Sequence, residues 1–553
     1  MPLLLRVLFV CLCFVSPLLG LAQCNPWATL ISGNQFTGAR SVVQEASGNL
    51  YLAGHFLQNV VIGSDTLTVS HPEPGIFLSK LSPEGIPIWN RHLPGKGFGF
   101  EPVLAQQGNF LYLALGFTDT LRLDSMEFIS PANESATVIA RLDTSGNTVW
   151  AEMLVGEVVT LDATSDATGD LILCGYFDTM AEFPDSTVLA TTGLAAFLCR
   201  LDRFGNLRWA IADTGQGLLS RMRALAVNEQ GEIYGAGVFI NRIEFNNLVG
   251  FGQVAGLPNP FLAKFAADGT PIWLQAGMNG GTTAEVFDLA IGAGGNVYTA
   301  GWQFGILAWD TVLIDGAQGT ALLGKWLPNG DPQWFRQAGK PNSMDARYVH
   351  RVVEFGPDGS VWVLSALGDS TVIDGQLFSS VGDQELKVLR YSAWDGLLQS
   401  VDDFPAVGNS GARKLIFDAD GSALVLGYFS APTYQFEGST LTNYGQDTSG
   451  SDVFLARLCG TPDFVGQAEA SPKEICVRVG PNPVPDAVVL EFNAPFRGEV
   501  RLLDLRGIPL RQISLSARAI TALRLDLRDL PAGIYLLELR EGSRRTIKRL
   551  SKF

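Results

Sequence analysis

The chain has 553 residues and a formal net charge of −16; 47% of its residues are hydrophobic and 17% are charged. It is longer than one ordinary domain, and its acidic excess argues against nucleic acid as a partner. Residues 477–553 hold 14 Lys and Arg against 8 Asp and Glu, so this tail carries +6 and the rest of the chain −22. An acidic surface of this kind favours a protein that stays dissolved outside the cell.

Residues 1–22 have the three-part form of a secretory signal peptide. Arg6 precedes the apolar run 7–15. A segment that contains small residues follows and ends at Ala22, and we expect cleavage after Ala22. A lipoprotein would use Cys24, but Gln23 stands where a small residue is expected. No other run approaches the ~18 uninterrupted apolar residues of a membrane span, so none is predicted.

One phrase then recurs five times: a basic residue, four intervening positions, Gly, three intervening positions and Trp. The phrases end at Trp89, Trp150, Trp209, Trp273 and Trp334, about 60 residues apart. In each unit we expect two strands joined by a Gly turn, a variable stretch, a third strand, and a fourth strand beginning at the Trp. Four antiparallel strands per unit are typical of a β-propeller blade.

The end of the repeat predicts how the ring closes. The sixth unit, RYSAWDGLLQS (390–400), lacks the Trp, and the seventh stops at 460 without a fourth strand. The segment 24–33 matches the segment that starts at Trp150, and its Trp27 stands one period before Trp89. We therefore expect residues 23–460 to form an all-β, seven-bladed β-propeller closed by the N-terminal strand.

Closure of the ring also predicts where some of the cysteines lie. Cys24 and Cys459 would lie side by side, where an oxidising compartment permits a disulfide. Cys174 and Cys199 occupy small-residue positions on neighbouring strands, and we expect them to fill the core as free thiols.

Residues 461–476 read as a polar linker, and 477–553 as a small Ig-like antiparallel β-sandwich. We expect its strands at 488–492, 499–505, 508–515, 522–527, 533–539 and 546–552. An ordinary Ig-like domain is one interpretation of residues 477–553.

The runs VGPNPVPDAVVLEF (479–492), LLDLRGIPLRQ (502–512), LDLRDLPAGIYLLELREG (525–542) and KRLSKF (548–553) resemble the type A C-terminal sorting domain of the type IX secretion system. The matching positions are Pro481, Asn482, Pro483, Gly507, Gly533 and Tyr535, while Gly480 replaces the usual aromatic. The resemblance implies the type IX machinery as partner and export across the outer membrane of a Bacteroidetes-type bacterium. It also implies removal of the tail, with release or attachment to surface lipopolysaccharide.

Residues 26–460 resemble the β-propeller repeats of large secreted Bacteroidetes proteins (SBBP-like repeats). That resemblance implies no defined activity.

Candidate sites are few. The Trp residues, Trp27 included, suit either packing between blades or stacking on sugars, and packing is favoured because they share one structural position. Asp162, Asp166 and Asp170, and Asp418 with Asp420, suit turn residues better than calcium ligands. The basic residue of each phrase is expected to pair with a turn carboxylate or to lie at the blade's edge. No catalytic, cofactor-binding or metal-binding residue is predicted, and no cofactor.

The sequence therefore predicts a secreted or surface-displayed binding or scaffold protein for an unknown glycan or protein. Its variable loops, 58–75, 241–259 and 432–451, are the expected ligand region. Two alternatives stay open: a polysaccharide-active enzyme with carboxylates from several blades, and a calcium-dependent adhesin. Convergent charged side chains in the central channel would favour the enzyme. A channel lined by apolar residues or glycine would favour the binding protein.

Overall fold

The chain divides into two compact units, Met1–Gly460 and Thr461–Phe553. The computed structural model describes residues 25–552 with the exception of 71–73, 96–101, 132–133, 280–282, 311, 340–348, 369, 383, 437–438, 444–450, 460–476, 481–486, 504–508, 516–519, 532 and 542–543. The described part is built almost wholly of strands, with one short 3-10 helix, η1 (Ala293–Gly295).

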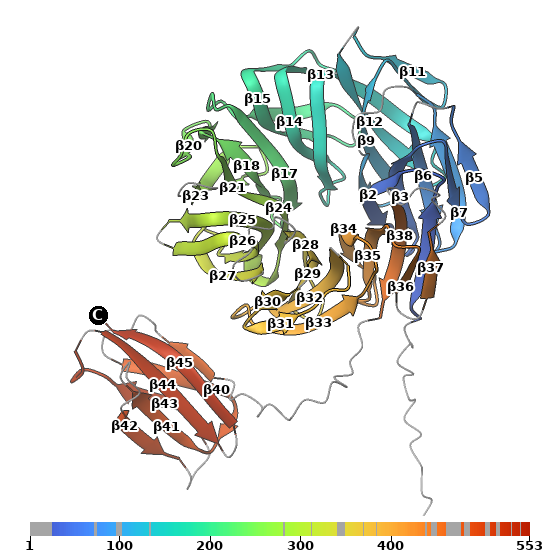
Figure 1. Cartoon of the computed structure of the whole chain (residues 1–553). Helices are drawn as coiled ribbons and strands as arrows, with labels where there is room; N and C mark the ends of the chain where they lie inside the picture. The colour runs from blue at the N-terminus through green and yellow to red at the C-terminus, as the bar shows by residue number, and fades with distance from the viewer. Residues whose placement is uncertain are drawn as a thin grey trace, which may run out of the picture. The chain divides into compact units, whose positions relative to one another are not determined.

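Unit 1 consists of four-stranded antiparallel groups that Figure 1 shows arranged radially around a central space. Each group contains an inner strand, two middle strands and an outer strand. Group 1 is β2 (Thr37–Gln44), β3 (Leu50–Phe56), β6 (Gly75–Leu81) and β7 (Pro87–Leu93). Group 2 is β8 (Val103–Gln107), β9 (Phe110–Thr118), β12 (Ser135–Asp143) and the first half of β13 (Thr148–Ser165). Group 3 is the second half of β13, β14 (Leu171–Glu182), β15 (Val188–Leu201) and β16 (Leu207–Ala212).

The next groups follow the same order. Group 4 is β17 (Leu219–Val227), β18 (Ile233–Ile240), β21 (Pro258–Phe265) and β22 (Pro271–Ala276). Group 5 is β24 (Thr283–Ile291), β25 (Val297–Trp309), β26 (Val312–Trp326) and β27 (Pro332–Gly339). Group 6 is β28 (Val349–Phe355), β29 (Ser360–Leu367), β32 (Glu385–Ser392) and β33 (Leu398–Phe404).

Group 7 combines the two ends of unit 1. It contains β34 (Ser410–Phe417), β35 (Ala423–Phe429), β38 (Asp452–Leu458) and, as outer strand, β1 (Trp27–Ser32). The β1–β38 ladder is antiparallel, with Trp27 opposite Arg457 and Ile31 opposite Val453.

Short hairpins join the middle strands of most groups. They are β4 (Asn59–Ile62) with β5 (Asp65–Thr68), β10 (Thr120–Leu123) with β11 (Met126–Ile129), β19 (Arg242–Phe245) with β20 (Leu248–Phe251), β30 (Thr371–Ile373) with β31 (Gln376–Phe378), and β36 (Thr433–Phe436) with β37 (Ser439–Thr442). β4 pairs with β1 and β30 with β27, while β23 (Met278–Asn279) pairs with β25. These pairings cover outer edges that are otherwise open to association.

The outer strands begin two residues earlier than expected. β7 begins at Pro87, not at Trp89, because a register shift between Lys80 and Leu81 lets Leu81 face Pro87. β16, β22 and β27 show the same offset, since their ladders shift at the equivalent place.

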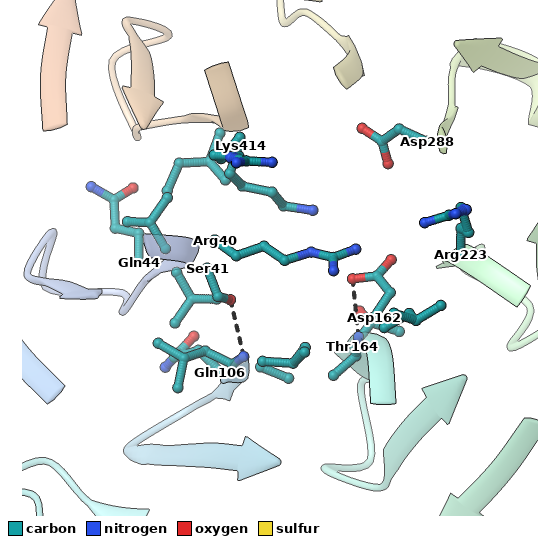
Figure 2. Close-up of a pocket in the computed structure, with 18 of the residues that line it drawn as sticks. Arg40, Ser41, Gln44, Gln106, Asp162, Thr164, Arg223, Asp288 and Lys414 are labelled. Carbon is teal, nitrogen blue, oxygen red and sulfur yellow. Dashed lines mark hydrogen bonds between the residues drawn. The ribbon is translucent and has the colours of Figure 1, made fainter. Parts of the chain in front are cut away.

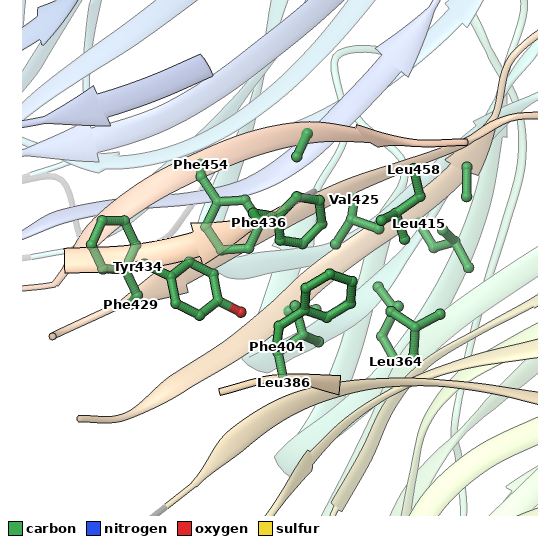
Figure 3. Packing of buried hydrophobic residues seen from close by; sticks show 14 of the residues in the cluster. Leu364, Leu386, Phe404, Leu415, Val425, Phe429, Tyr434, Phe436, Phe454 and Leu458 are labelled. Carbon is green, nitrogen blue, oxygen red and sulfur yellow. The ribbon is translucent and has the colours of Figure 1, made fainter. Parts of the chain in front are cut away.

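The buried side chains lie between neighbouring groups. Figure 3 shows one such cluster, in which Leu364 and Leu386 of group 6 pack with Val425 and Phe454 of group 7. Another cluster joins Leu424 and Leu455 of group 7 to Val42 of group 1, together with Ile31 of β1. Each fully buried aliphatic side chain of this kind stabilises the fold by about 1.5–3 kcal/mol. The contact between the first and last groups is therefore packed like the others.

Unit 2 is a small antiparallel β-sandwich. One sheet holds β39 (Val477–Gly480), β40 (Ala487–Phe496) and β43 (Ile520–Asp526); the other holds β42 (Pro509–Ser514), β41 (Glu499–Leu503), β44 (Gly533–Glu541) and β45 (Arg544–Lys552). Its core includes Val488, Leu502 and Leu537. Every strand expected in the tail is present within a few residues, and β39 is additional.

Candidate functional site

A cavity of about 500 Å³ lies among the inner strands of unit 1. Its lining comes from β2, β8, β13, β17, β24, β28 and β34, which are the inner strands of all the groups. Figure 2 shows Arg40, Lys414, Asp162, Asp288 and Arg223 extending into it. The cavity is thus the central channel, and its lining is charged.

A repeated β-bulge supplies many of these side chains. Six inner strands skip one residue at the same place in their ladder with the next strand. A bulge leaves the extra residue unpaired and re-aims its side chain. The skipped residues are Arg40, Leu161, Arg223, Phe287, Arg351 and Arg413, and all of them line the cavity.

A small residue on the neighbouring strand makes room for each bulge. A Cβ on Gly237 would collide with the backbone oxygen of Arg221, two positions before the bulged Arg223. Equivalent close approaches occur at Gly54, Gly175, Gly301 and Gly427. Five of the six bulges therefore have a glycine on the second strand, and the bulge at Arg351 has Ser365 there.

The residue after the bulge links neighbouring groups. The Oγ of Ser41 accepts a hydrogen bond from the Leu104 amide at 2.9 Å. The Oδ2 of Asp162 accepts from the Leu225 amide at 2.9 Å, and that of Asp288 from the Val353 amide at 3.0 Å. Two cavity carboxylates therefore have a structural role between inner strands.

The acidic side chains in and next to the channel differ in how far their pKa values are raised. Burial raises the pKa of Glu354 to about 8, and the charge of Lys414 only partly opposes this. Burial likewise raises the pKa of Asp288 to about 6. Burial alone would lower the pKa of Lys414, but the charges of Asp162, Asp288 and Glu354 raise it above its usual value. Lys414 therefore stays protonated, and Glu354 keeps its proton to a higher pH than an exposed glutamate does.

The repeated tryptophans lie at the outer strands, away from this cavity. Five of the six indoles donate from Nε1 to a backbone oxygen in the next group's last turn: Trp27 to Pro83, Trp150 to Arg203, Trp209 to Ala267, Trp273 to Pro328 and Trp334 to Trp394, at 3.0–3.1 Å. Trp89 packs on Gly146 of group 2, and its Nε1 has no hydrogen-bond partner among the described residues. The Gly and Trp of the phrase thus meet across groups.

Four of the five candidate calcium ligands are occupied by guanidinium groups, and Asp162 accepts the Leu225 amide. Arg200 bonds Asp170 at 2.9 Å and also pairs with Asp166. Arg457 bonds Asp418 at 2.8 Å and also pairs with Asp420. In the described part of the chain, no group of three or more His, Cys, Asp or Glu is arranged to hold a metal ion.

The basic residues of the other phrases divide into two kinds. Lys80 pairs with Glu45 at 3.1 Å and Lys264 with Glu232 at 2.7 Å, both in a turn of their own group, as expected. Lys325 instead donates to the Ala393 carbonyl oxygen at 2.6 Å, and Arg141 to that of Arg203, both in the next group.

The cysteines are placed as follows. Cys174 and Cys199 are buried and free, as expected. Cys459 is disulfide-bonded, whereas Cys24 lies outside the described residues.

In unit 2, Gly533 opens β44 and the Tyr535 hydroxyl donates to the Pro531 carbonyl oxygen at 2.6 Å. Pro481, Asn482, Pro483 and Gly507 lie outside the described residues. The described strands here form the two sheets of the sandwich, and this is the segment that carries a family match.

Residues 478–552 match the secretion system C-terminal sorting domain. The protein is exported to the cell surface or the extracellular space. Its tail engages the type IX secretion machinery, as in secreted Bacteroidetes-type proteins. Within the described residues, no helix has the length and apolar character needed to cross a membrane.

The rest of the chain has only distant likenesses. A search of curated protein sequences finds no match. Among solved structures, a protein of unknown function from Bacteroides caccae is 11% identical, covering 52% of this chain and 78% of its own, with a TM-score of 0.30. The quinohemoprotein alcohol dehydrogenase from Comamonas testosteroni is 9% identical, covering 82% and 79%, with a TM-score of 0.33. A protein of unknown function from Dyadobacter fermentans is 10% identical, covering 78% and 98%, with a TM-score of 0.31. Likenesses this weak carry no functional argument.

Sequence reasoning missed the channel residues. No described residue of the expected ligand loops, 58–75, 241–259 and 432–451, lines this cavity. A signal was present, because Arg40 precedes Gly54 by the same interval as Arg223 precedes Gly237 and Arg413 precedes Gly427. Aligning the repeats on the glycine of the second strand would have revealed it.

Proposed function

We propose that the protein is a secreted or surface-bound binding protein whose unit 1 is a closed seven-bladed β-propeller. The observation that carries the export part is the sorting-domain match over residues 478–552. The signal peptide at 1–22, the SBBP-like character of residues 26–460 and the fate of the tail after export belong to the same proposal.

Closure of the ring is supported by pairing and packing. β1 completes group 7 through its ladder with β38, and Ile31 packs with residues of groups 7 and 1. Continuing that ladder outward from the Trp27–Arg457 pair puts Asn25 opposite Cys459. Cys24 would then stand next to Cys459, which favours it as the disulfide partner.

A binding role is supported by the form of the channel. It is a concave, partly enclosed site of the size of small-molecule sites, which run from roughly 300 to 1,000 Å³. Two of its carboxylates, Asp162 and Asp288, already accept backbone amides. Groups held in this way are suited to keeping the channel's shape.

A second candidate is the polysaccharide-active enzyme. Charged side chains from several groups converge in the channel, the pattern that the sequence argument associated with catalysis. Glu354 and Asp288 have pKa values raised to different extents, as paired acid and base carboxyls do. The calcium-dependent adhesin has less support, because the candidate aspartates are paired with Arg200 and Arg457.

Two experiments test these proposals. The chain with and without residues 478–552 should be expressed in a bacterium with a type IX system and followed in cell-surface, medium and periplasmic fractions. Retention of the truncated chain is expected, and equal export of both would contradict the assignment. The purified chain from Gln23 onward should then be screened on a glycan array beside a polysaccharide-hydrolysis assay. Binding without turnover supports the binding protein; turnover that Glu354→Gln abolishes supports the enzyme.

A further inference from the structure

Three arginines occupy the same bulge position in three inner strands that lie side by side. They are Arg351 of β28, Arg413 of β34 and Arg40 of β2, and we call them the arginine arc. β34 contacts both β28 and β2, so the arc follows one side of the channel. All three residues line the cavity.

The arc is not neutralised by neighbouring side chains. Among the described residues, none of the three guanidinium groups has a hydrogen-bond or ion-pair partner, whereas Arg223 across the channel pairs with Glu285. Aromatic rings orient two of them: the Arg351 guanidinium carbon lies 4.7 Å from the ring centre of Phe287, and that of Arg413 4.9 Å from that of Tyr428. The donors are thus held in place and left unused.

Five basic side chains line the cavity against two carboxylates, although the chain as a whole carries −16. Burial, and then the charge of Arg413, lower the pKa of Arg351. Asp162 and Asp288 are engaged by backbone amides and stabilise the charge of Lys414. Arg351 and Arg413 are exposed to the water of the channel, which screens part of their mutual repulsion, and a bound anion would relieve the rest.

We propose that the arginine arc is an oxyanion-binding site, and that the central cavity takes a small ligand bearing a carboxylate, sulfate or phosphate group. This inference rests on the proposed binding function and adds the chemistry of its ligand. Guanidinium groups offer paired N–H donors that match such oxyanions. The cavity, at about 500 Å³, has room for a sugar ring.

The test is isothermal titration calorimetry on the chain from Gln23 onward with four matched sugars. Glucuronate, glucose 6-sulfate and glucose 6-phosphate each carry one oxyanion, and glucose carries none. We expect at least one anionic sugar to bind at least tenfold more tightly than glucose, and the preferred one identifies the oxyanion. Arg351→Gln and Arg413→Gln should each weaken that binding about tenfold.

Arg122→Gln is the control variant, since Arg122 is an exposed residue of β10 that pairs with Glu127 and does not line the cavity. It should bind like the parent chain. The inference is overturned if no anionic sugar binds better than glucose, or if the two arc variants bind like the Arg122 variant. A neutral glycan found on the array would in that case leave the binding function standing without the oxyanion site. Unchanged melting temperatures of the variants exclude unfolding as the cause of lost binding.

Discussion

The indole Nε1 of Trp150 donates a 3.0 Å hydrogen bond to the carbonyl oxygen of Arg203, in the turn between β15 and β16 of the next group. The same indole lies against Gly205 of that turn, whose φ is 91°. Tryptophan and glycine of the repeated phrase therefore contact each other across groups. This contact explains why the phrase recurs: each copy supplies the tryptophan for one junction and the glycine for the junction before it.

Gly205→Ala tests this contact. An added Cβ would lie 3.1–3.2 Å from atoms of the Trp150 ring and would also be strained by the positive φ. We expect a loss of about 2–3 kcal/mol in the free energy of unfolding, from both effects. Gly359→Ala is the matched control, since its φ is 79° and an added Cβ meets no atom within 4 Å. It should cost only about 1 kcal/mol. Equal losses in urea unfolding of the two variants would contradict the packing role.

Glu354→Gln tests the charge balance of the channel. The pKa of Glu354 rises from 4.5 in the unfolded chain to about 8 in the folded protein, chiefly through burial. The folded state therefore binds the proton more tightly, and this contribution to stability is lost as pH rises from about 4.5 to 8. The variant should equal the parent chain at pH 4 and be more stable by about 1–2 kcal/mol at pH 9. Melting temperatures across pH measure this, and a constant difference would contradict it.

Binding of an anionic sugar should also depend on pH. The charged groups around the site are the arginine arc, Arg223, Lys414, Asp162, Glu285, Asp288 and Glu354. Asp288 and Glu354 lose their protons around pH 6 and 8, so the cavity becomes more negative as pH rises. For glucuronate and glucose 6-sulfate, whose own charge is constant over this range, we expect the dissociation constant to increase about tenfold between pH 5.5 and 9. In Glu354→Gln the increase should be smaller, and an identical increase would show that another group is responsible.

The ends of unit 1 should be joined covalently. Cys459 is disulfide-bonded. We propose Cys24 as its partner, because continuing the β1–β38 register beyond the Trp27–Arg457 pair would bring residue 24 next to it. Non-reducing peptide mapping should therefore find a Cys24–Cys459 peptide. Cys459→Ser should lower the free energy of unfolding by about 2–4 kcal/mol. Cys199→Ser is the comparison, because Cys199 is a free thiol. Detection of Cys24 as a free thiol would contradict the proposed pairing.

The periodicity of the sequence predicted the all-β architecture and the strands of the tail. Strand order follows from turns and alternating residues, and the strands of the tail lie within a few residues of their expected ranges. The residue spacing also predicted that a basic residue pairs with a turn carboxylate, as Lys264 does with Glu232. This pairing was predictable because Lys264 and Glu232 lie within one repeat.

The channel could not be predicted in the same way. Arg40, Arg351 and Arg413 are distant in sequence and meet only because inner strands converge on one axis. The bulge that aims them is set by backbone geometry, with Gly54 and Gly427 opposite the bulges of Arg40 and Arg413. The hydrophobic pattern of a sequence does not reveal the extra unpaired residue of a bulge.

The most direct test of the account is a crystal structure of the chain soaked with the tightest-binding anionic sugar. The account predicts electron density in the central cavity, with the oxyanion about 2.8 Å from guanidinium nitrogens of Arg351 and Arg413. Sugar bound on the outer hairpins, or a cavity that holds only water at saturating ligand, would contradict it.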